Sequence, residues 1–198
     1  MANLPDCNVL FERYFERWYP KEYVAARGKP SILPDISNRH DLVGMNTEQI
    51  SPLTPEWQAR TQNQIDEMLR AAQADWPKSW AVREPVSPQW VEVFDNFFTA
   101  HKISELLKSS PEDNFTNQYV VLCCEFGAVM GHVLRQVNPR LVWLLDYPYW
   151  DSSLFDPASG ISMAVFHWAI KKMSSYGVAD GYVAKMGMCL QLLEKHAR

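Results

Sequence analysis

Residues 115–176 read FTNQYVVLCCEFGAVMGHVLRQVNPRLVWLLDYPYWDSSLFDPASGISMAVFHWAIKKMSSY, and this stretch decides the fold. Apolar side chains cover most of the circumference from about residue 115 to residue 137, which predicts a helix buried on several sides. The run that follows is rich in Val, Trp and Leu. It therefore predicts a β-strand over residues 140–146 and a second, antiparallel strand over residues 149–155.

A turn rich in Ser, Asp, Pro and Gly follows the second strand, over residues 156–160. Beyond it, the apolar pattern predicts another helix that begins at Ile161 and is ended by Gly177. The stretch as a whole is therefore predicted to be a helix, a β-hairpin and a helix folded on one another.

Two glycines, Gly127 and Gly131, lie four residues apart in the first of these helices and so share one face. A glycine inside a helix costs about 1 kcal/mol relative to alanine, so a packing reason is expected at each position. Missing side chains let another element approach closely. We predict that this face receives the hairpin or a neighbouring helix.

The N-terminal part of the chain gives a weaker pattern. Residues 7–19, CNVLFERYFERWY, place apolar side chains at helical spacing and predict an amphipathic helix that docks on the rest of the protein. Between residues 20 and 55, five prolines and two glycines break any long element. This segment is predicted to be a long surface loop wrapped around the core.

Three further helices are predicted from capping residues and apolar periodicity. Thr54 is an N-cap for a helix over residues 55–76, and Ser87 is an N-cap for a helix over residues 88–110, each with proline at its first position. The last helix is predicted from about Asp180 to His196.

Together these elements predict an α+β fold that is predominantly α-helical, with about six helices and one small antiparallel hairpin or sheet near residues 140–155. The length of 198 residues and the 47% hydrophobic content fit a single globular domain over residues 1–198. The segment over residues 20–55 would then lie between the N-terminal helix and the main helical core.

Composition argues against several classes of function. A net charge of −4 disfavours nucleic-acid binding, which needs a clustered basic face, and no run of about 18 uninterrupted apolar residues predicts a membrane span. The first residues lack the basic-then-apolar order of a signal peptide. Cys7, Cys123, Cys124 and Cys189 lack the C-x-x-C spacing of a metal or redox site and are predicted to be reduced core residues. We therefore expect a cytoplasmic protein.

The net charge is concentrated in one region. Residues 56–113 carry ten acidic and six basic side chains, which accounts for the whole net charge of −4. The simplest interpretation is the solvated face of two amphipathic helices. An acidic face of this kind also suits a partner with a basic surface.

The sequence contains no ordered set of catalytic or metal-binding residues. The five histidines form no H-x-x-x-H or H-E-x-x-H pair, and no G-x-S-x-G, P-loop or G-x-G-x-x-G motif occurs. We therefore predict no metal and no cofactor. Glu125, His132, Asp146 and His167 would form a general acid/base set only if the fold brought them together.

One order of residues resembles a known pattern. Glu125-Phe-Gly127-x-x-x-Gly131-His-Val-Leu is followed by a strand containing Trp143 and by a glycine turn before Gly160-Ile-Ser-Met-Ala-Val-Phe166. This order resembles small bacterial domains of unknown function, some of which are immunity proteins encoded beside secreted toxins. The resemblance covers about residues 115–176, and no functional residue carries over from it.

The leading hypothesis is a non-enzymatic cytosolic binding protein, an immunity protein that occludes the active site of a toxin. Its partner would be a protein with a basic surface, rather than a nucleic acid or a membrane. Two surfaces are candidates for the contact, the acidic helices and the aromatic hairpin. The candidate partner-binding residues are Glu92, Asp95, Glu105, Tyr147, Tyr149, Trp150 and Asp151.

Two alternatives stay open at this point. The first is a small hydrolase-like enzyme that uses the Glu, His and Asp side chains named above in one cleft. The second is an assembly subunit, in which the helix over residues 7–19 docks on a second copy to form a homodimer.

Overall fold

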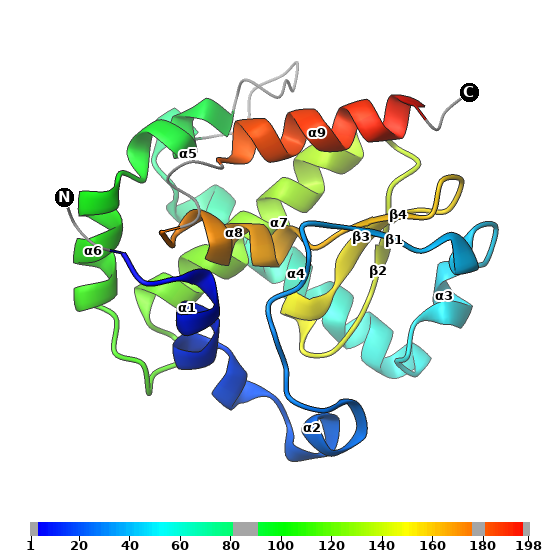
Figure 1. Cartoon of the computed structure of the whole chain (residues 1–198), viewed down its shortest axis with the longest axis horizontal. Helices are drawn as coiled ribbons and strands as arrows, with labels where there is room; N and C mark the ends of the chain where they lie inside the picture. The colour runs from blue at the N-terminus through cyan, green and yellow to red at the C-terminus, as the bar shows by residue number, and fades with distance from the viewer. Residues whose placement is uncertain (1–3, 81–90, 176–180, 196–198) are drawn as a thin grey trace.

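Helix α7 (Gln118–Val137) is the central element of the fold, and α8 (Val165–Lys172) packs against it. The computed structural model describes residues 4–80, 91–175 and 181–195. Figure 1 shows a small sheet at one end of the molecule and helices α5 and α6 at the other. The remaining helices are α1 (Cys7–Tyr14), α2 (Lys21–Arg27), α3 (Thr47–Ile50), α4 (Pro55–Asp75), α5 (Glu92–Phe97), α6 (Ala100–Lys108) and α9 (Tyr182–Lys195). The α+β, predominantly helical fold predicted from the sequence is confirmed.

The two glycines of α7 are packing sites for two different elements. A Cβ atom at Gly127 would lie 2.1 Å from the ring of Phe166 and 2.8 Å from its Cα, so α8 rests directly on the α7 backbone. A Cβ atom at Gly131 would lie 2.3 Å from the indole of Trp143, on the first hairpin strand. The prediction of close approach at this face is confirmed for the helix and for the hairpin.

The sheet has four antiparallel strands in the order β1-β4-β3-β2. Strands β2 (Val142–Leu144) and β3 (Ser153–Asp156) form a hairpin, as predicted. The predicted start of the second strand at Tyr149 is wrong, because Tyr149–Asp151 form a 3-10 turn after Pro148. The residues expected to begin the next helix instead form β4 (Ile161–Met163), and α8 starts only at Val165. The predicted start of that helix at Ile161 is therefore wrong. The helix also ends earlier than predicted, at Lys172, and Gly177 itself lies outside the described residues.

The error at Ile161 has a physical reason. Strand β4 has only three residues, so the Ile-Ser-Met alternation is too short to be distinguished from the start of the apolar helix pattern that follows it. Pairing with β3 on one side and β1 (Ile36–Asn38) on the other satisfies the backbone of β4. Strand β1 lies more than a hundred residues before β4 in the sequence, so this pairing cannot be read from local periodicity.

The segment over residues 20–55 is more structured than a loop. It contains α2, the edge strand β1, a 3-10 turn over His40–Leu42 and α3. Gly160 has a φ of +76°, and a Cβ there would lie 2.8 Å from the carbonyl oxygen of Arg39. That glycine therefore lets the segment pass close to the β3–β4 turn.

Local capping signals placed several helix ends correctly. The Thr54 hydroxyl accepts a hydrogen bond from the backbone of Trp57 at the start of α4, with Pro55 at the first position, as predicted. One helix was expected after Ser87, but its described part forms two helices, α5 and α6. The helical conformation is interrupted at Phe98, and Thr99 caps the start of α6. Ser87 itself lies outside the described residues.

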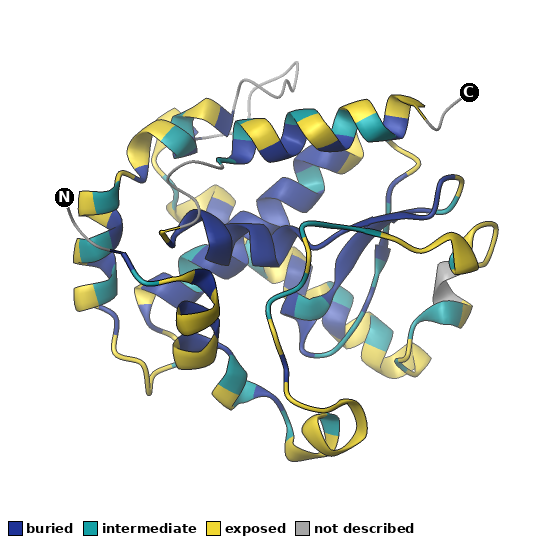
Figure 2. Ribbon diagram, viewed as in Figure 1, coloured by how far each residue is buried: buried dark blue, intermediate teal, exposed yellow. Residues whose placement is uncertain are grey.

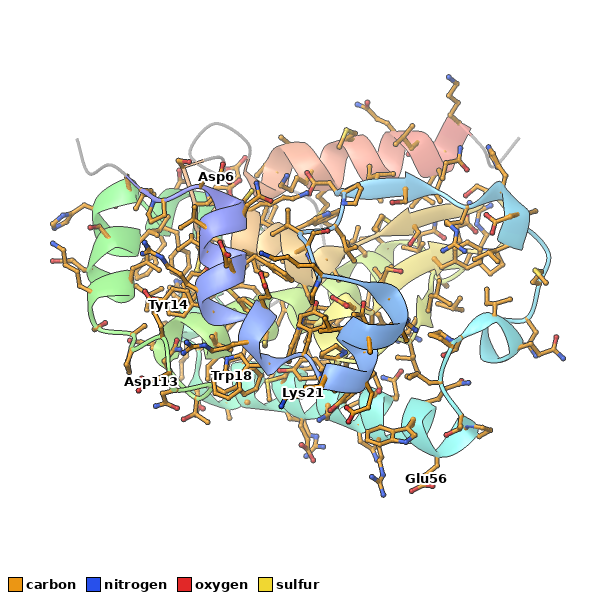
Figure 3. All side chains as sticks on the ribbon, turned by 60° about the horizontal axis from the view of Figure 1, so that its bottom comes forward. Asp6, Tyr14, Trp18, Lys21, Glu56 and Asp113 are labelled. Atoms are coloured by element: carbon orange, nitrogen blue, oxygen red, sulfur yellow. The ribbon has the colours of Figure 1, made fainter. Side chains whose placement is uncertain are left out.

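The N-terminal helix is shorter than predicted. Asp6 caps α1, which ends at Tyr14, and a 3-10 turn over Glu16–Trp18 follows. Figure 3 shows Asp6, Tyr14 and Trp18 in this order along a segment that lies across the rest of the molecule. The Tyr14 hydroxyl donates to the Ser110 carbonyl at 3.0 Å, which ties the segment to the end of α6.

Burial confirms which elements form the core. Every residue of α8 is buried, and Figure 2 shows α7 and α8 covered over most of their length while α2 is largely exposed. All four cysteines are free and buried, and burial raises the pKa of the Cys124 thiol to about 12. Within the described residues, α7 is long and apolar enough to cross a membrane. About two thirds of its most apolar window is buried, as in a core helix.

Candidate functional site

Two cavities are lined by four of the acidic residues that the sequence singles out, namely Asp146, Asp151, Glu105 and Glu125. The first, the polar cleft, has a volume of about 350 Å³ and lies between the segment over residues 27–52 and the inner sheet strands. The second, the aromatic cavity, has a volume of about 780 Å³ and lies among the end of α4, helices α5 and α6, and the first half of α7. Both volumes fall in the range of ligand sites in proteins.

In the polar cleft, the Asp151 carboxylate is hydrogen-bonded on both oxygens. Tyr19 donates to Oδ1, Tyr23 donates to Oδ2 at 3.0 Å, and the fully buried His167 ring lies 3.2 Å from Oδ1 through Nε2. The other ring nitrogen of His167 accepts the backbone N–H of Leu33 at 2.9 Å. This pattern assigns the proton of the neutral imidazole to Nε2, which donates to Asp151.

The environment of Asp151 also controls the two tyrosines. Burial, followed by the negative charge of Asp151, raises the pKa of Tyr23 to about 12 and raises the pKa of Tyr19 still further. Both phenols therefore stay protonated and remain donors at neutral pH. Because His167 uses both ring nitrogens inside the core, it has no nitrogen available to accept a proton from a substrate.

The remaining charges near the polar cleft are paired as well. One Arg27 nitrogen contacts both Asp146 carboxylate oxygens, at 2.8 and 2.9 Å. Burial raises the pKa of Asp146, and the hydrogen bond from Arg27 works in the opposite direction. Arg39 pairs with Asp41 at 3.2 Å on the exposed side of the cleft.

Beside the cleft, three charged side chains with little solvent exposure connect the segment over residues 27–52 to helices α8 and α9. Asp35 accepts from Lys171 of α8 at 2.6 Å and from Lys185 of α9 at 2.5 Å. Lys171 also donates to the Leu33 carbonyl at 2.8 Å, and the Trp168 indole donates to the Asp35 carbonyl at 3.0 Å. We call Asp35, Lys171 and Lys185 the lysine clamp.

The aromatic cavity has a different lining. Its walls are the rings of Trp76, Trp80, Phe97 and Phe98, and Trp80 contacts the ring of Phe97 edge-on at a centroid distance of 4.5 Å. Among the described residues, the ionisable side chains that line it are three carboxylates and one ammonium group. These side chains are Asp75, Glu105, Glu125 and Lys102.

Glu125 is the buried acid of the aromatic cavity. The residue is 4% exposed and projects from α7, and its Oε2 accepts the indole N–H of Trp76 at 2.7 Å. Burial raises the pKa of the Glu125 carboxyl, the Trp76 hydrogen bond lowers it, and the charge of Asp75 raises it further. Within the described parts of the chain, no lysine, arginine or histidine lies within 4.0 Å of this carboxylate.

The predicted partner-binding residues fall into two groups. Tyr149 and Trp150 are 7% and 4% exposed, and Asp151 is held by the hydrogen bonds described above, so these three belong to the interior. Asp95 is also structural, because its carboxylate accepts the backbone N–H groups of Tyr182 and Val183 at the start of α9. The surface that these predicted residues offer to a partner is therefore smaller than the sequence suggested.

The other predicted residues remain accessible. Glu92 is exposed on α5, and Glu105 is exposed at the edge of the aromatic cavity, where it pairs with His101 at 3.4 Å. Tyr147 is half-buried, and its ring lies 5.1 Å from that of Trp57. These three residues stay candidates for contact with a partner.

The four residues of the enzyme alternative do not share one cavity. Asp146 lines the polar cleft, His167 lies behind it against Asp151, and Glu125 lines the aromatic cavity. His132 lines neither of them. Within the described residues, no group of three His, Cys, Asp or Glu side chains is placed to hold a metal ion.

Sequence reasoning missed the aromatic walls of the second cavity. Trp76 and Trp80 lie four residues apart at the end of α4 and in the 3-10 turn that follows, over Lys78–Trp80. Phe97 and Phe98 lie at the end of α5, just before α6 begins. Trp76 did have a usable signal, its position at the end of a predicted helix, where rings are less completely covered than in the middle of a core helix. Phe97 and Phe98 had none, because they lie in the middle of the helix predicted over residues 88–110.

Comparison with protein families, curated proteins and solved structures finds no match to this chain.

Proposed function

We propose that this protein is a non-enzymatic binding protein of the bacterial cytosol, and specifically an immunity protein that occludes the active site of a toxin. The observation that carries this proposal is the aromatic cavity. It is an accessible hollow with aromatic walls, and its lining contains three carboxylates and one ammonium group. Aromatic pockets near the surface are the usual places where a partner's anchor residue is buried.

The charge around the cavity supports a basic partner. Glu105 at its edge and Glu92 on the neighbouring helix are exposed, and both belong to the region that holds the whole net charge of −4. Exposed charges of one sign raise the rate of encounter with an oppositely charged surface. A toxin that acts on a polyanion or an acidic substrate would present such a basic surface at its active site.

The polar cleft gives the enzyme alternative no comparable support. Its carboxylates are hydrogen-bonded to the protein's own tyrosines, histidine and arginine. A general base needs a lone pair within reach of the substrate's proton. His167 offers none, because Leu33 already donates to its Nδ1 atom.

The test is co-purification and toxin neutralisation with the products of neighbouring genes. We expect a stable complex, and we expect Glu105→Lys to slow association about tenfold at low salt. Glu194→Lys is the matched control, because Glu194 is exposed on α9 and lines neither of the two cavities. If no neighbouring product is bound or neutralised, the proposed function is wrong.

A further inference from the structure

The aromatic cavity contains a buried carboxylate that the described residues neutralise only in part. Glu125 accepts a single hydrogen bond, from Trp76, and that donor is a neutral indole. The other carboxylate oxygen, Oε1, has no donor among the described residues and is not fully buried, so it is accessible from the cavity. A buried carboxylate with so few donors is unfavourable unless it is protonated, gains further hydrogen bonds or receives a positive ligand.

The walls of the cavity suit the same ligand chemistry. Cations bind to the faces of Trp and Phe rings because the π-system carries negative charge there. The cavity already contains one example, since the Lys102 ammonium lies 3.6 Å from the centre of the Phe97 ring. The neighbouring rings of Trp76 and Trp80 meet edge to face, with centroids 5.8 Å apart.

The shape and charge of the site limit the choice of ligand. A volume of about 780 Å³ exceeds what one side chain needs, and among the described lining residues the carboxylates outnumber the ammonium group by three to one. An apolar stem would be covered by the rings, and a terminal charge would meet Glu125. A neutral ligand would leave that carboxylate unpaired, and an anion would be repelled.

From these contacts we infer that the aromatic cavity binds an alkylguanidinium or alkylammonium group, supplied as an arginine or lysine side chain of the protein partner. This inference rests on the proposed function for the source of the group. The chemistry of the site itself rests on Glu125, the four rings and the charge of the lining. The basic side chain would be the anchor, with its charge hydrogen-bonded to Glu125 and its stem between the rings.

The cavity can be tested without knowing the partner. The full-length protein is titrated with n-butylguanidinium and n-butylammonium, and with 1-butanol as the uncharged control. Binding is followed through the indole N–H resonance of Trp76, which is hydrogen-bonded to Glu125. We expect both cations to shift this resonance and the alcohol to leave it in place.

Glu125→Gln is the decisive variant, because it keeps the size of the side chain and a hydrogen-bond acceptor for Trp76 while removing the charge. It should weaken binding of the cations about tenfold. A Phe97→Leu variant, which removes one wall ring, should weaken binding by a smaller factor. Equal binding of the alcohol, or cation binding unchanged in Glu125→Gln, would overturn the inference.

Repeating the titration in an Arg83→Ala background removes the only basic residue of the undescribed residues 81–90. Binding that occurs only in that background would also overturn the inference, because the ligand would then be the chain's own side chain. The two proposals fail separately. Cation binding with no toxin neutralisation would refute the proposed function, and neutralisation without cation binding would refute only the assignment of this cavity.

Discussion

The two cavities of this protein contain similar numbers of acidic residues, but the carboxylates differ in how many hydrogen-bond donors the protein supplies to them. In the polar cleft, Asp146 and Asp151 are each held by two or more contacts from the protein's own side chains. In the aromatic cavity, Glu125 has a single neutral donor. Carboxylates that are hydrogen-bonded on both oxygens hold the segment over residues 20–55 against the core, whereas Glu125 keeps one oxygen available to an external cation. Perturbing equivalent groups in the two regions tests this difference.

The largest effect is expected at the lysine clamp. Replacing Asp35 with alanine leaves the buried ammonium groups of Lys171 and Lys185 without their carboxylate. Breaking a buried ion pair from one side destabilises a protein by about 3–5 kcal/mol. We expect a loss of this size in the free energy of unfolding, measured by urea denaturation.

Asp41→Ala is the control for this variant, because it removes a carboxylate from the same segment. Asp41 is 65% exposed and pairs with the exposed Arg39. Its removal should leave the urea midpoint unchanged. Equal effects of the two variants would show that the clamp contributes no more than a surface pair.

A smaller loss is expected at the glycine face of α7. Alanine at Gly127 would place its Cβ atom against the backbone and ring of Phe166, so α7 and α8 would have to separate. Overpacking of this kind costs about 1–3 kcal/mol. Gly187→Ala in α9 meets nothing within 4 Å and should instead stabilise the protein by about 0.5–1 kcal/mol. A stabilising Gly127→Ala would contradict the packing described here.

These glycines also mark how much of the fold could be predicted from the sequence. The buried helix over residues 118–137, the hairpin and the Thr54 cap were predictable, because each depends on periodicity or capping within a few residues. Strand β4 was not, because it is only three residues long and its partner β1 is distant in the sequence. For the same reason, the sequence did not show that β1 lies inside the segment predicted to be a loop.

The candidate site was less predictable than the fold. Glu125 and Glu105 were singled out individually, but for different hypotheses, and only the fold brings them to one cavity. The aromatic hairpin was considered as a binding surface because Tyr and Trp are common at interfaces. The burial of Tyr149 and Trp150 depends on contacts with α1, α8 and the Phe115 ring, which no local pattern records.

An isosteric change in the polar cleft should have a moderate effect. Asp151→Asn keeps the shape of the side chain but replaces one acceptor with an N–H₂ group facing Tyr19, Tyr23 or His167. Leaving a buried donor without an acceptor costs about 1–3 kcal/mol. We expect a loss in that range by thermal or urea unfolding. A loss near zero would mean that the network can rearrange around an amide.

The corresponding change in the aromatic cavity, Glu125→Gln, should have the smallest effect on stability. Because the pKa of Glu125 is raised in the folded protein, the folded state binds a proton more tightly than the unfolded state does. The ionised carboxylate therefore destabilises the fold above the folded pKa, and this penalty disappears as the pH falls toward 4.5, the ordinary value. A neutral glutamine has no such penalty at any pH.

We expect Glu125→Gln to match or exceed the wild type in stability at pH 7. The advantage should shrink as the pH is lowered, as measured by urea unfolding at several pH values. A large loss at pH 7 would mean that Glu125 is paired like Asp151, and the contrast between the two cavities would not hold.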